Sequence, residues 1–351
     1  MLVQIAPVLG VFLAQLGSAN AVQANPWNFV SLRADDFAVS ETATGREFRA
    51  TVHGMPFIEA VPSWIGRAEG GSSLAFFVRP ATPGAQEFCL GTWGQGEAAT
   101  CSRSSVNDQE DTFGKVSTDT WILKQPTTDF EVRVVATNGP NGQSPRFSRL
   151  NFVLSGSSVP PADSLTHRWG TLLDVPMRAQ MNYEKGNVLC SPTSISMILA
   201  YWSKRMETPQ IDADVPEVQA GVFDPGWNGT GNWPFNVAFA ASRLGMTGYV
   251  TRLRSIEDIE AFVAEGIPVA CSVSYGHLKG KGKQDNDGHL VVVVGFQDDG
   301  TPIFNDPGRN VVRMTYLRDD FARAWAESKN TVYIVHPKGW PTPSNGPWPQ
   351  N

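Results

Sequence analysis

The alternation of apolar and polar positions divides the chain into two parts. Between Trp27 and Leu154, short runs rich in Phe, Val and Leu alternate with clusters of Gly, Pro, Asn and Ser, and no amphipathic helix separates them. Three of these runs are SLAFFVRP, DFEVRVVATN and SRLNFVLS. Short apolar runs bounded by turn residues are typical of β-strands. The first part is therefore predicted to be an all-β sandwich covering residues 22–154.

The second part mixes helical and strand periodicity. Apolar residues recur at three- and four-residue spacing after Cys190, Trp233 and Ser255, which predicts three helices with one buried face each. Apolar runs follow, namely IPVACSVSY, HLVVVVGF, TPIFN and TVYIVH, with one further helix, DDFARAWAES, before the last run. Helices gathered before a mostly antiparallel sheet predict an α+β domain over residues 169–337.

The remaining segments differ in composition from both domains. Residues 155–168 contain the small, polar stretch SGSSVPPADS, which predicts a linker. Residues 1–21 contain an apolar run and an A-x-A pattern, which predict a secretory signal peptide, although no Lys or Arg precedes the run. The signal segment predicts a secreted protein, and since no later segment reaches the roughly 18 apolar residues of a transmembrane helix, the mature protein is expected to be soluble. The Pro-rich residues 338–351 are predicted to form a tail that extends along the surface.

Charge and motif spacing narrow the choice of partners. The formal net charge is −6 and the sequence pI is near 5.4, which argues against nucleic acid or an anionic membrane as the main partner. No C-x-x-C, H-E-x-x-H, EF-hand or P-loop spacing occurs, so no metal and no cofactor are expected. The tryptophans of the first part fit a buried core better than a binding platform, but contact with a polysaccharide or a cell surface through this domain stays open.

Three of the four cysteines have structural interpretations. Cys89 and Cys101 flank the Gly-rich segment CLGTWGQGEAATC, which predicts a disulfide in an oxidising compartment. Cys271 lies inside an apolar run and is expected to be an inert core residue. A disulfide between Cys190 and Cys271 is a less favoured alternative.

Cys190 stands directly before a predicted helix. Ser191 is a good N-cap and Pro192 suits the first helical position. The unpaired N–H groups and the positive end of the helix dipole favour a thiolate there, which lowers the pKa of the cysteine. The alternative is a small buried cysteine at the start of a core helix.

A nucleophilic thiol requires a base and a group that orients the base. His289 opens the run HLVVVVGF, and after the turn signal DDG the chain returns through TPIFN to Asp306. This pattern predicts a hairpin across which the two side chains can meet. A core histidine with a satisfied hydrogen bond is the alternative, but the combination with Cys190 favours a catalytic role.

The block Asn232-Trp233-Pro234-Phe235 has two interpretations. Asn232 and Trp233 could bind substrate as the polar contact and the apolar wall of a cleft. Alternatively, Asn232 caps a helix and Trp233 packs against its first turn.

Residues 173–337 resemble the peptidase C39-like branch of the papain-like cysteine peptidases, in particular the bacterial secreted group. The resemblance covers VPMRAQ, CSPTSISMILAYW, GNWPFNVAFA, GIPVACSVSY, GHLVVVVGF with DGTPIFNDP, and RMTYLRDDFARAW. The first domain, with PSWIGRA, VRP and DTW, resembles the β-rich region that precedes the peptidase domain in that group. The resemblance implies a papain-like fold, in which a helix carrying the cysteine packs on an antiparallel sheet.

The resemblance also implies a role for each site residue. Cys190 is the nucleophile, His289 the general base and then acid, and Asp306 the residue that orients the imidazole. Gln180, ten residues before Cys190, matches the family glutamine whose side-chain amide donates to the oxyanion. The chain is thus expected to be a secreted cysteine peptidase that acts on peptide or protein substrates. The alternatives are an amidase or transferase with the same three residues, and a non-catalytic module that binds peptides or cell-wall fragments.

Overall fold

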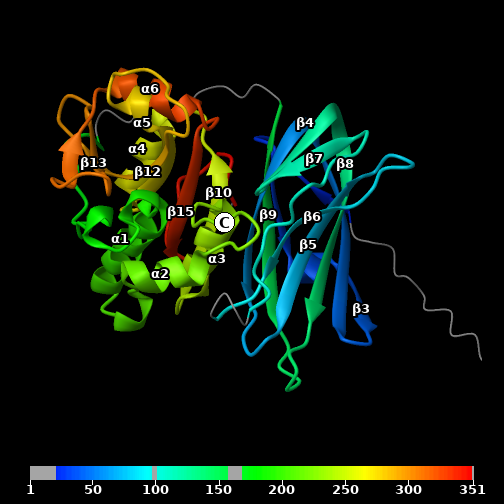
Figure 1. Ribbon diagram of the computed structural model, residues 1–351. Helices are drawn as coiled ribbons and strands as arrows, with labels where there is room; N and C mark the ends of the chain where they lie inside the picture. The colour runs from blue at the N-terminus through cyan, green and yellow to red at the C-terminus, as the bar shows by residue number, and fades with distance from the viewer. Residues whose placement is uncertain (1–20, 97–100, 157–167, 350–351) are drawn as a thin grey trace, which may run out of the picture.

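Figure 1 shows the computed structural model, in which residues 21–96, 101–156 and 168–349 are described. The chain forms an all-β domain followed by a domain of helices and strands, and the two lie side by side (Figure 1). The predicted signal segment 1–21 lies outside the described residues except for Ala21, and so does most of the predicted linker 155–168.

Nine strands of the first domain are joined by hydrogen bonds into one sheet. Their order is β2-β9-β4-β8-β5-β6, with β1 and β3 paired to β4 and β7 paired to β8. The 23-residue strand β4 pairs with β8 along its first half and with β9 along its second half, so two separate sheets are not formed. The predicted all-β class is confirmed. The strands are β1 (Ala21–Gln23), β2 (Phe29–Arg33), β3 (Ala38–Thr42), β4 (Gly45–Arg67), β5 (Ser73–Pro80), β6 (Phe88–Trp93), β7 (Gly114–Ser117), β8 (Thr120–Thr137) and β9 (Arg146–Ser155).

Aromatic side chains fill the core of this sheet. Trp64, Trp93 and Trp121 are fully buried, as expected for core residues rather than for a binding platform. The ring of Trp64 stacks on Phe76 with 4.1 Å between centroids, and Trp121 lies edge to face with Phe130 at 5.6 Å. Such ring pairs stabilise the core by about 0.5–1.5 kcal/mol each beyond the burial of their area.

The predicted disulfide between Cys89 and Cys101 is wrong, because both thiols are free. Thr92 pairs with Ser104 in an antiparallel bridge. Cys89 lies three residues before Thr92 and Cys101 three residues before Ser104, and these displacements run in opposite directions along the ladder. The two cysteines are therefore separated by roughly 20 Å along the strands, far beyond the roughly 4–7 Å between Cα atoms that a disulfide requires.

The second domain combines six helices with a six-stranded antiparallel sheet among the described residues, which confirms the predicted α+β class. The strand order is β10-β15-β11-β12-β13-β14. None of the described helices is long and apolar enough to cross a membrane. The strands are β10 (Met246–Arg252), β11 (Val269–Ser274), β12 (Gly288–Phe296), β13 (Pro302–Asn305), β14 (Arg313–Thr315) and β15 (Thr331–Pro337), and the helices are α1 (Cys190–Arg205), α2 (Val215–Val222), α3 (Trp233–Ser242), α4 (Ile256–Ala264), α5 (Tyr275–Leu278) and α6 (Arg318–Ala326).

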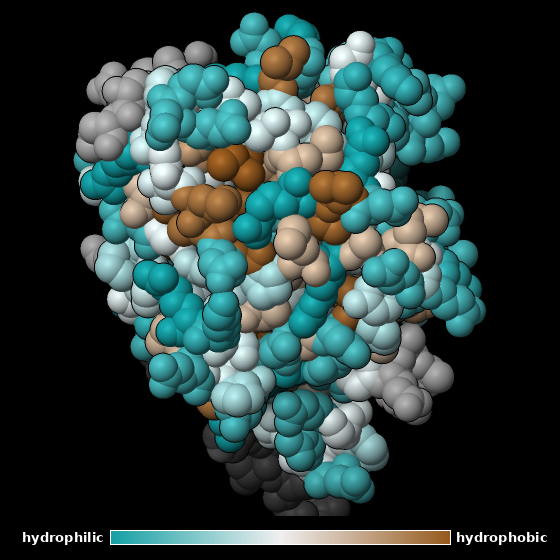
Figure 2. Space-filling view, turned by 90° about the vertical axis from the view of Figure 1, so that its left-hand side faces the viewer, coloured by the Kyte–Doolittle hydropathy of each residue, from teal (hydrophilic) through white to brown (hydrophobic). Residues whose placement is uncertain are grey.

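The outer surface of this domain is mainly polar. Figure 2 views the face of the second domain that lies on the left in Figure 1, and apolar residues appear there in small areas separated by polar ones. Large apolar side chains that are exposed in this domain include Leu172, Met177, Met181 and Val311.

A buried interface joins the two domains. β10 lies beside β9 in Figure 1, and the Val250 N–H of β10 donates to Ser63 Oγ of β4 at 3.0 Å. Trp64 also packs edge to face against Phe235 of α3, with 5.9 Å between centroids. The buried guanidinium of Arg103, from the first domain, donates to the carbonyl oxygens of Ala220 and Phe223 at the end of α2. The first domain therefore supports helices of the second directly.

Two tryptophans fix the tail after Pro337 to the protein. Trp348 is buried, and its ring lies 4.8 Å from that of Phe262. Trp340 packs against Trp202 of α1 at 4.9 Å and donates its indole N–H to Glu265 O. Trp340 and Trp348 thus anchor the tail, because their indoles provide apolar area that packs against the second domain. The many Pro residues around them make this anchoring hard to predict from the sequence.

Candidate active site

Cys190 is the first residue of α1, whose N-cap is Leu189. Ser191 is therefore not the N-cap, and its buried hydroxyl instead contacts Tyr333 Oη at 3.0 Å. The first N–H groups of a helix lack intrahelical partners, so the thiol lies at the positive end of the helix dipole, as expected. Ser194 Oγ donates to Leu290 O of β12 at 3.3 Å, which fixes the start of α1 beside that strand.

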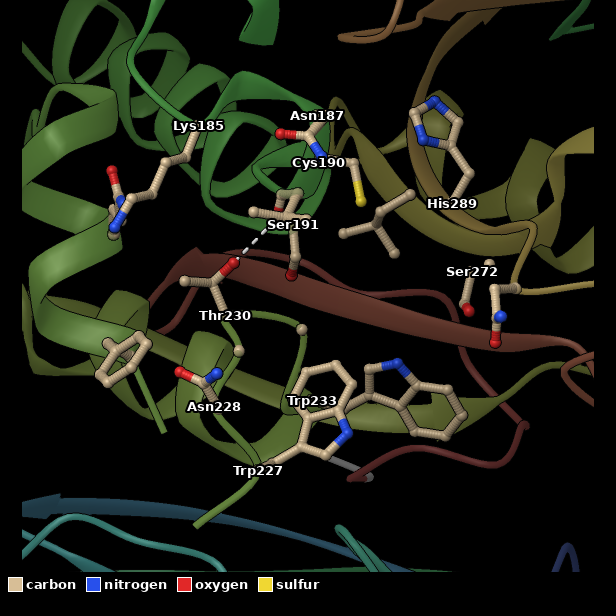
Figure 3. A pocket seen from close by; sticks show the side chains of 18 of the residues that line it. Lys185, Asn187, Cys190, Ser191, Trp227, Asn228, Thr230, Trp233, Ser272 and His289 are labelled. Atoms are coloured by element: carbon tan, nitrogen blue, oxygen red, sulfur yellow. Dashed lines mark hydrogen bonds between the residues drawn. The ribbon is translucent and has the colours of Figure 1, made fainter. Parts of the chain in front are cut away.

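His289 and Asp306 meet across the hairpin of β12 and β13. The register pairs Val292 with Asn305, so His289 lies before the paired segment and Asp306 directly after it. His289 Nε2 is 2.7 Å from Asp306 Oδ1, and both side chains are buried. The other ring nitrogen of His289 remains for Cys190, with which the imidazole interacts electrostatically. Figure 3 shows Cys190 and His289 at the same end of a cavity.

The three side chains shift each other's pKa values. Burial is the largest single influence on the pKa of Cys190 and would raise it, but the interaction with His289 and the backbone N–H groups of the site together lower this pKa. Burial also disfavours protonated His289, yet the hydrogen bonds with Asp306 and Cys190 raise its pKa to about 9. Burial would raise the pKa of Asp306, but His289, the Tyr316 hydroxyl and the Gly308 N–H together lower it. A lowered pKa at the thiol and a raised pKa at the imidazole both favour the thiolate–imidazolium form of the pair.

Cys271 provides a contrast on the same sheet. It is fully buried in β11, and burial raises the pKa of its thiol well above the ordinary value. No cationic partner offsets this effect. Cys271 is an inert core residue, as the sequence predicts.

Two tyrosines that the sequence analysis missed hold the imidazole and the carboxylate. Tyr316 donates its hydroxyl to Asp306 Oδ2, and the Gly308 N–H donates to Asp306 Oδ1 at 2.9 Å. The ring of Tyr275 lies 4.1 Å from that of His289. Tyr275 ends the run IPVACSVSY and Tyr316 lies in RMTYLRDD, so both could have been noted as neighbours of conspicuous motifs. Their contacts with the site depend on packing between separate elements.

A cavity of about 1250 Å³, called here the main cavity, opens in front of Cys190 and His289. Figure 3 shows the sulfur of Cys190 directed into it, with the indoles of Trp227 and Trp233 on the facing side. Trp227, which is 48% exposed, was missed because nothing in its local sequence marks it. Helix α2 and its end contribute further apolar wall. The apolar residues that line the main cavity include Val188, Pro216, Ala220, Phe223, Trp227 and Trp233.

A smaller cavity of about 380 Å³ adjoins the main cavity and shares Trp227, Gly231 and Trp233 with it. Residues 117–120, the turn between β7 and β8, line this smaller cavity from the first domain. Thr118 at the tip has φ +55°, a left-handed conformation that a β-branched residue rarely adopts. The first domain therefore extends the wall of the space in front of Cys190.

The other predicted site residues have different outcomes. Trp233 lines the main cavity, as expected for a cleft wall. Asn232 is buried and caps α3, because its Oδ1 accepts from Phe235 N–H at 3.2 Å and its Nδ2 donates to Asp224 at 3.0 Å. The prediction that Asn232 contacts substrate is wrong, since both ends of its amide are engaged inside the protein.

Gln180 is held close to the site without lining the main cavity. It begins a short 3-10 helix, Gln180–Asn182, and its N–H donates to Pro307 O at 2.8 Å, next to Asp306. Its side chain is buried, and its Oε1 has no hydrogen-bond partner among the described residues. Its role as an oxyanion donor stays a prediction. No cluster of three or more His, Cys, Asp or Glu side chains within the described ranges could hold a metal ion.

Asp119 links the first domain to the wall of the main cavity. Replacing it with Asn is expected to change how the free energy of unfolding depends on pH. Asp119 accepts from the Trp233 N–H at 2.8 Å, and burial raises its pKa from 3.8 to about 6. The folded protein binds this proton more tightly than the unfolded chain does. The stabilisation that the proton gives to the folded state is therefore fully present below the pKa of Asp119 in the unfolded chain, and it is lost as the pH rises through about 6. The free energy of unfolding of the wild type should thus fall relative to Asp119→Asn by roughly 2–3 kcal/mol over that range.

Urea unfolding of both proteins at several pH values between about 4 and 7 measures this difference. Asp129→Asn is the matched control, because Asp129 pairs with His53 at a half-exposed position on the same domain. A difference between the wild type and Asp119→Asn that does not change with pH would contradict the prediction.

Comparison with known proteins gives two family matches. Residues 172–333 match the Peptidase_C39 like family, and residues 41–155 match the Peptidase C39 N-terminal domain. Among curated proteins, none matches the chain.

Solved structures with some similarity include three from Bacillus species. A candidate C39-like peptidase from Bacillus anthracis is 18% identical, with coverage of 48% of this chain and 97% of its own, at a TM-score of 0.38. The mosquito-larvicidal Cry4Aa toxin from Bacillus thuringiensis is 9% identical, with 39% and 25% coverage and a TM-score of 0.22. A Cry1Da tryptic core variant from Bacillus thuringiensis is also 9% identical, with 40% and 25% coverage and a TM-score of 0.21. These scores are too low to support an argument.

Proposed function

We propose that the chain, whose residues 172–333 match the Peptidase_C39 like family and whose residues 41–155 match the Peptidase C39 N-terminal domain, is a cysteine peptidase. The observation that carries the proposal is that Cys190 and His289 line one end of the main cavity, with His289 hydrogen-bonded to Asp306 behind it at 2.7 Å. An activated thiol is needed for turnover and not for binding alone, so this arrangement favours an enzyme over a non-catalytic binding module.

The proposed reaction is acyl transfer through a thioester. The Cys190 thiolate forms a bond to the substrate carbonyl carbon, and the resulting oxyanion accepts hydrogen bonds from the Cys190 N–H and the Gln180 side-chain amide. The C–N bond then breaks as His289 gives its proton to the departing amine. Water attacks the thioester while His289 takes its proton, the C–S bond breaks, and a carboxylate and the Cys190 thiolate are left.

Asp306 acts as a positioning residue in this proposal. Its carboxylate holds the imidazole by Nε2 and stabilises the charge that His289 carries. Tyr316 and the Gly308 N–H fix the carboxylate in turn, so the imidazole has one favoured orientation toward the thiol. A helix that carries the thiol beside an antiparallel sheet that carries its partners supports the papain-like description of the domain.

The substrate proposed is an extended polypeptide with a large apolar side chain close to the scissile bond. The indoles of Trp227 and Trp233 and the apolar residues of α2 offer a surface for such a side chain. Secretion is part of the proposal, and the apolar run and A-x-A pattern of residues 1–21 support it.

A peptide library and a thiol-directed peptide probe test the function together. The full chain is expected to cleave library peptides, with preference for bulky apolar residues beside the cleaved bond, and the probe is expected to modify Cys190 stoichiometrically. Mass spectrometry of the labelled protein locates the modified thiol. Cys101, which is half-buried, and the buried Cys271 serve as internal controls. Equal rates of modification at Cys190 and Cys101, without cleavage of any peptide, would refute the proposal.

A further inference from the structure

A second cavity, of about 570 Å³, lies between the two domains and away from Cys190. The first domain contributes the end of β2 and part of β9, and the second contributes β10 and the chain after β15. β9 and β10 lie next to each other in Figure 1, which places this interdomain cavity at the boundary of the two sheets. Its volume is within the range of roughly 300–1000 Å³ that is typical of sites for small molecules.

Cations outnumber carboxylates in the lining of the interdomain cavity. Arg33, Arg149 and Lys338 all face it, and none of them forms an ion pair with another described residue. Asp35 is the carboxylate in the lining, and His336 is buried with a lowered pKa, which favours its neutral form. Burial and the charge of Arg33 lower the pKa of Arg149 against a smaller opposite effect of Asp36, so the charges of Arg33 and Arg149 lie close enough to repel each other. The lining therefore carries an excess of positive charge.

Two buried donors in the same lining have no partner. Tyr249 is 3% exposed and its hydroxyl makes no hydrogen bond within the described residues. Asn151 is 0% exposed, and its Nδ2 likewise has no partner, although its Oδ1 accepts from Ser31 Oγ at 2.8 Å. An unpaired buried polar group costs roughly 1–3 kcal/mol. Two such groups beside unpaired cations indicate a place where a ligand with several acceptor oxygens would complete the hydrogen bonding.

The neighbouring groups hold these donors in place. Arg149 Nη1 donates to Ser31 Oγ at 3.2 Å, so Arg149, Ser31 and Asn151 form one connected network on β2 and β9. The ring of Tyr249 lies edge to face with Phe29 at 5.9 Å and with His336 at 6.1 Å. A donor set fixed before binding loses little conformational entropy when a ligand arrives.

We propose that the interdomain cavity binds an organic anion, whose carboxylate or phosphate oxygens accept hydrogen bonds from Arg33, Arg149 and Lys338 and from the orphaned donors of Tyr249 and Asn151. The apolar part of the ligand lies against Ile65 and Phe147, which also line the cavity. Because the donors come from both domains, the bound anion joins them and stabilises the two-domain arrangement. This site is separate from Cys190, and its occupation does not depend on peptidase activity.

Thermal unfolding and calorimetric titration of the full chain test the proposal with inorganic phosphate, phenyl phosphate and benzoate, each compared with chloride at equal ionic strength. Phenyl phosphate or benzoate is expected to raise the Tm saturably and to bind more tightly than inorganic phosphate, because its ring packs against Phe147. The tighter of the two assigns the anion as a phosphate or a carboxylate. The absence of saturable binding for all three probes overturns the proposal.

Three variants separate this site from general charge effects. Arg149→Gln is expected to raise the Kd at least about tenfold, because a charge-assisted hydrogen bond is lost. Tyr249→Phe removes a hydroxyl that has no partner, so it should weaken binding several-fold without lowering the Tm of the free protein. The matched control Arg79→Gln removes one positive charge from a surface ion pair with Glu131 and should leave the Kd unchanged. Equal weakening by Arg79→Gln, or unchanged binding by Tyr249→Phe, overturns the proposal.

Discussion

Cys190→Ala is expected to lower kcat/KM for peptide hydrolysis by at least about 10⁴-fold, to the level of the reaction without the thiol. The sulfur forms the bond to the acyl group in the proposed mechanism, and no other described cysteine lines the main cavity. The side chain of Cys190 lies at the start of α1, whose next turns are buried, so removing one sulfur should leave the helix folded. Initial rates on the best library peptide measure the effect.

Cys271→Ala is the matched control for this experiment. It removes a thiol from the same domain, but Cys271 lies inside the sheet and its pKa is raised. This variant is expected to keep its kcat/KM per folded molecule while losing some stability. If Cys190→Ala retained hydrolysis while Cys271→Ala lost it, Cys190 would not be the nucleophile.

Asp306→Asn is expected to reduce kcat by roughly 10²–10⁴-fold and to narrow the pH range of activity from both sides. The hydrogen bond to Asp306 helps to raise the pKa of His289 to about 9, so its loss moves the alkaline limit of activity to lower pH. A less stable imidazolium also supports the Cys190 thiolate less well, which raises the pKa of Cys190 and moves the acid limit to higher pH. Alkylation rates of Cys190 and kcat, both measured against pH, give the two limits.

Asp299→Asn provides the comparison within the same hairpin. Asp299 is exposed in the turn between β12 and β13 and accepts from the Thr301 N–H at 2.9 Å, far from the imidazole in the ladder. Its variant should retain the wild-type pH profile. An Asp306→Asn profile that only drops in height, with both limits unchanged, would show that Asp306 does not act through the pKa of His289.

The parts of the site that follow the chain locally were predictable from the sequence. A cysteine at a helix start and a histidine and an aspartate on adjoining strands are set by helical spacing and by the length of one hairpin, so Cys190, His289 and Asp306 could be brought together without coordinates. Asn232 shows where such reasoning fails. A helix-capping asparagine and a ligand-binding one can have the same local sequence. Only the structure shows that the amide of Asn232 is already hydrogen-bonded to Asp224 and to the N–H of Phe235.

Features that depend on packing between distant segments were not predictable. The register of Thr92 with Ser104 decides that Cys89 and Cys101 stay apart, and spacing along the chain carries no information about that register. Tyr316 reaches Asp306 from the segment after β14. The sequence also left the role of the first domain open. In the structure, Asp119 of that domain accepts a hydrogen bond from the N–H of Trp233 at the start of α3, and in this way the domain reaches the wall of the main cavity.

The contact between Trp64 and Phe235 also has a consequence for how the chain folds during synthesis. β2 pairs with β9, so the first sheet cannot close until the ribosome has added residue 155. The face that carries Trp64 then waits for Phe235, and until α3 emerges the nascent chain exposes aromatic surface of the kind that chaperones bind. Completion of the second domain therefore protects the first, and a nascent chain that stalls before residue 233 is the species most exposed to aggregation.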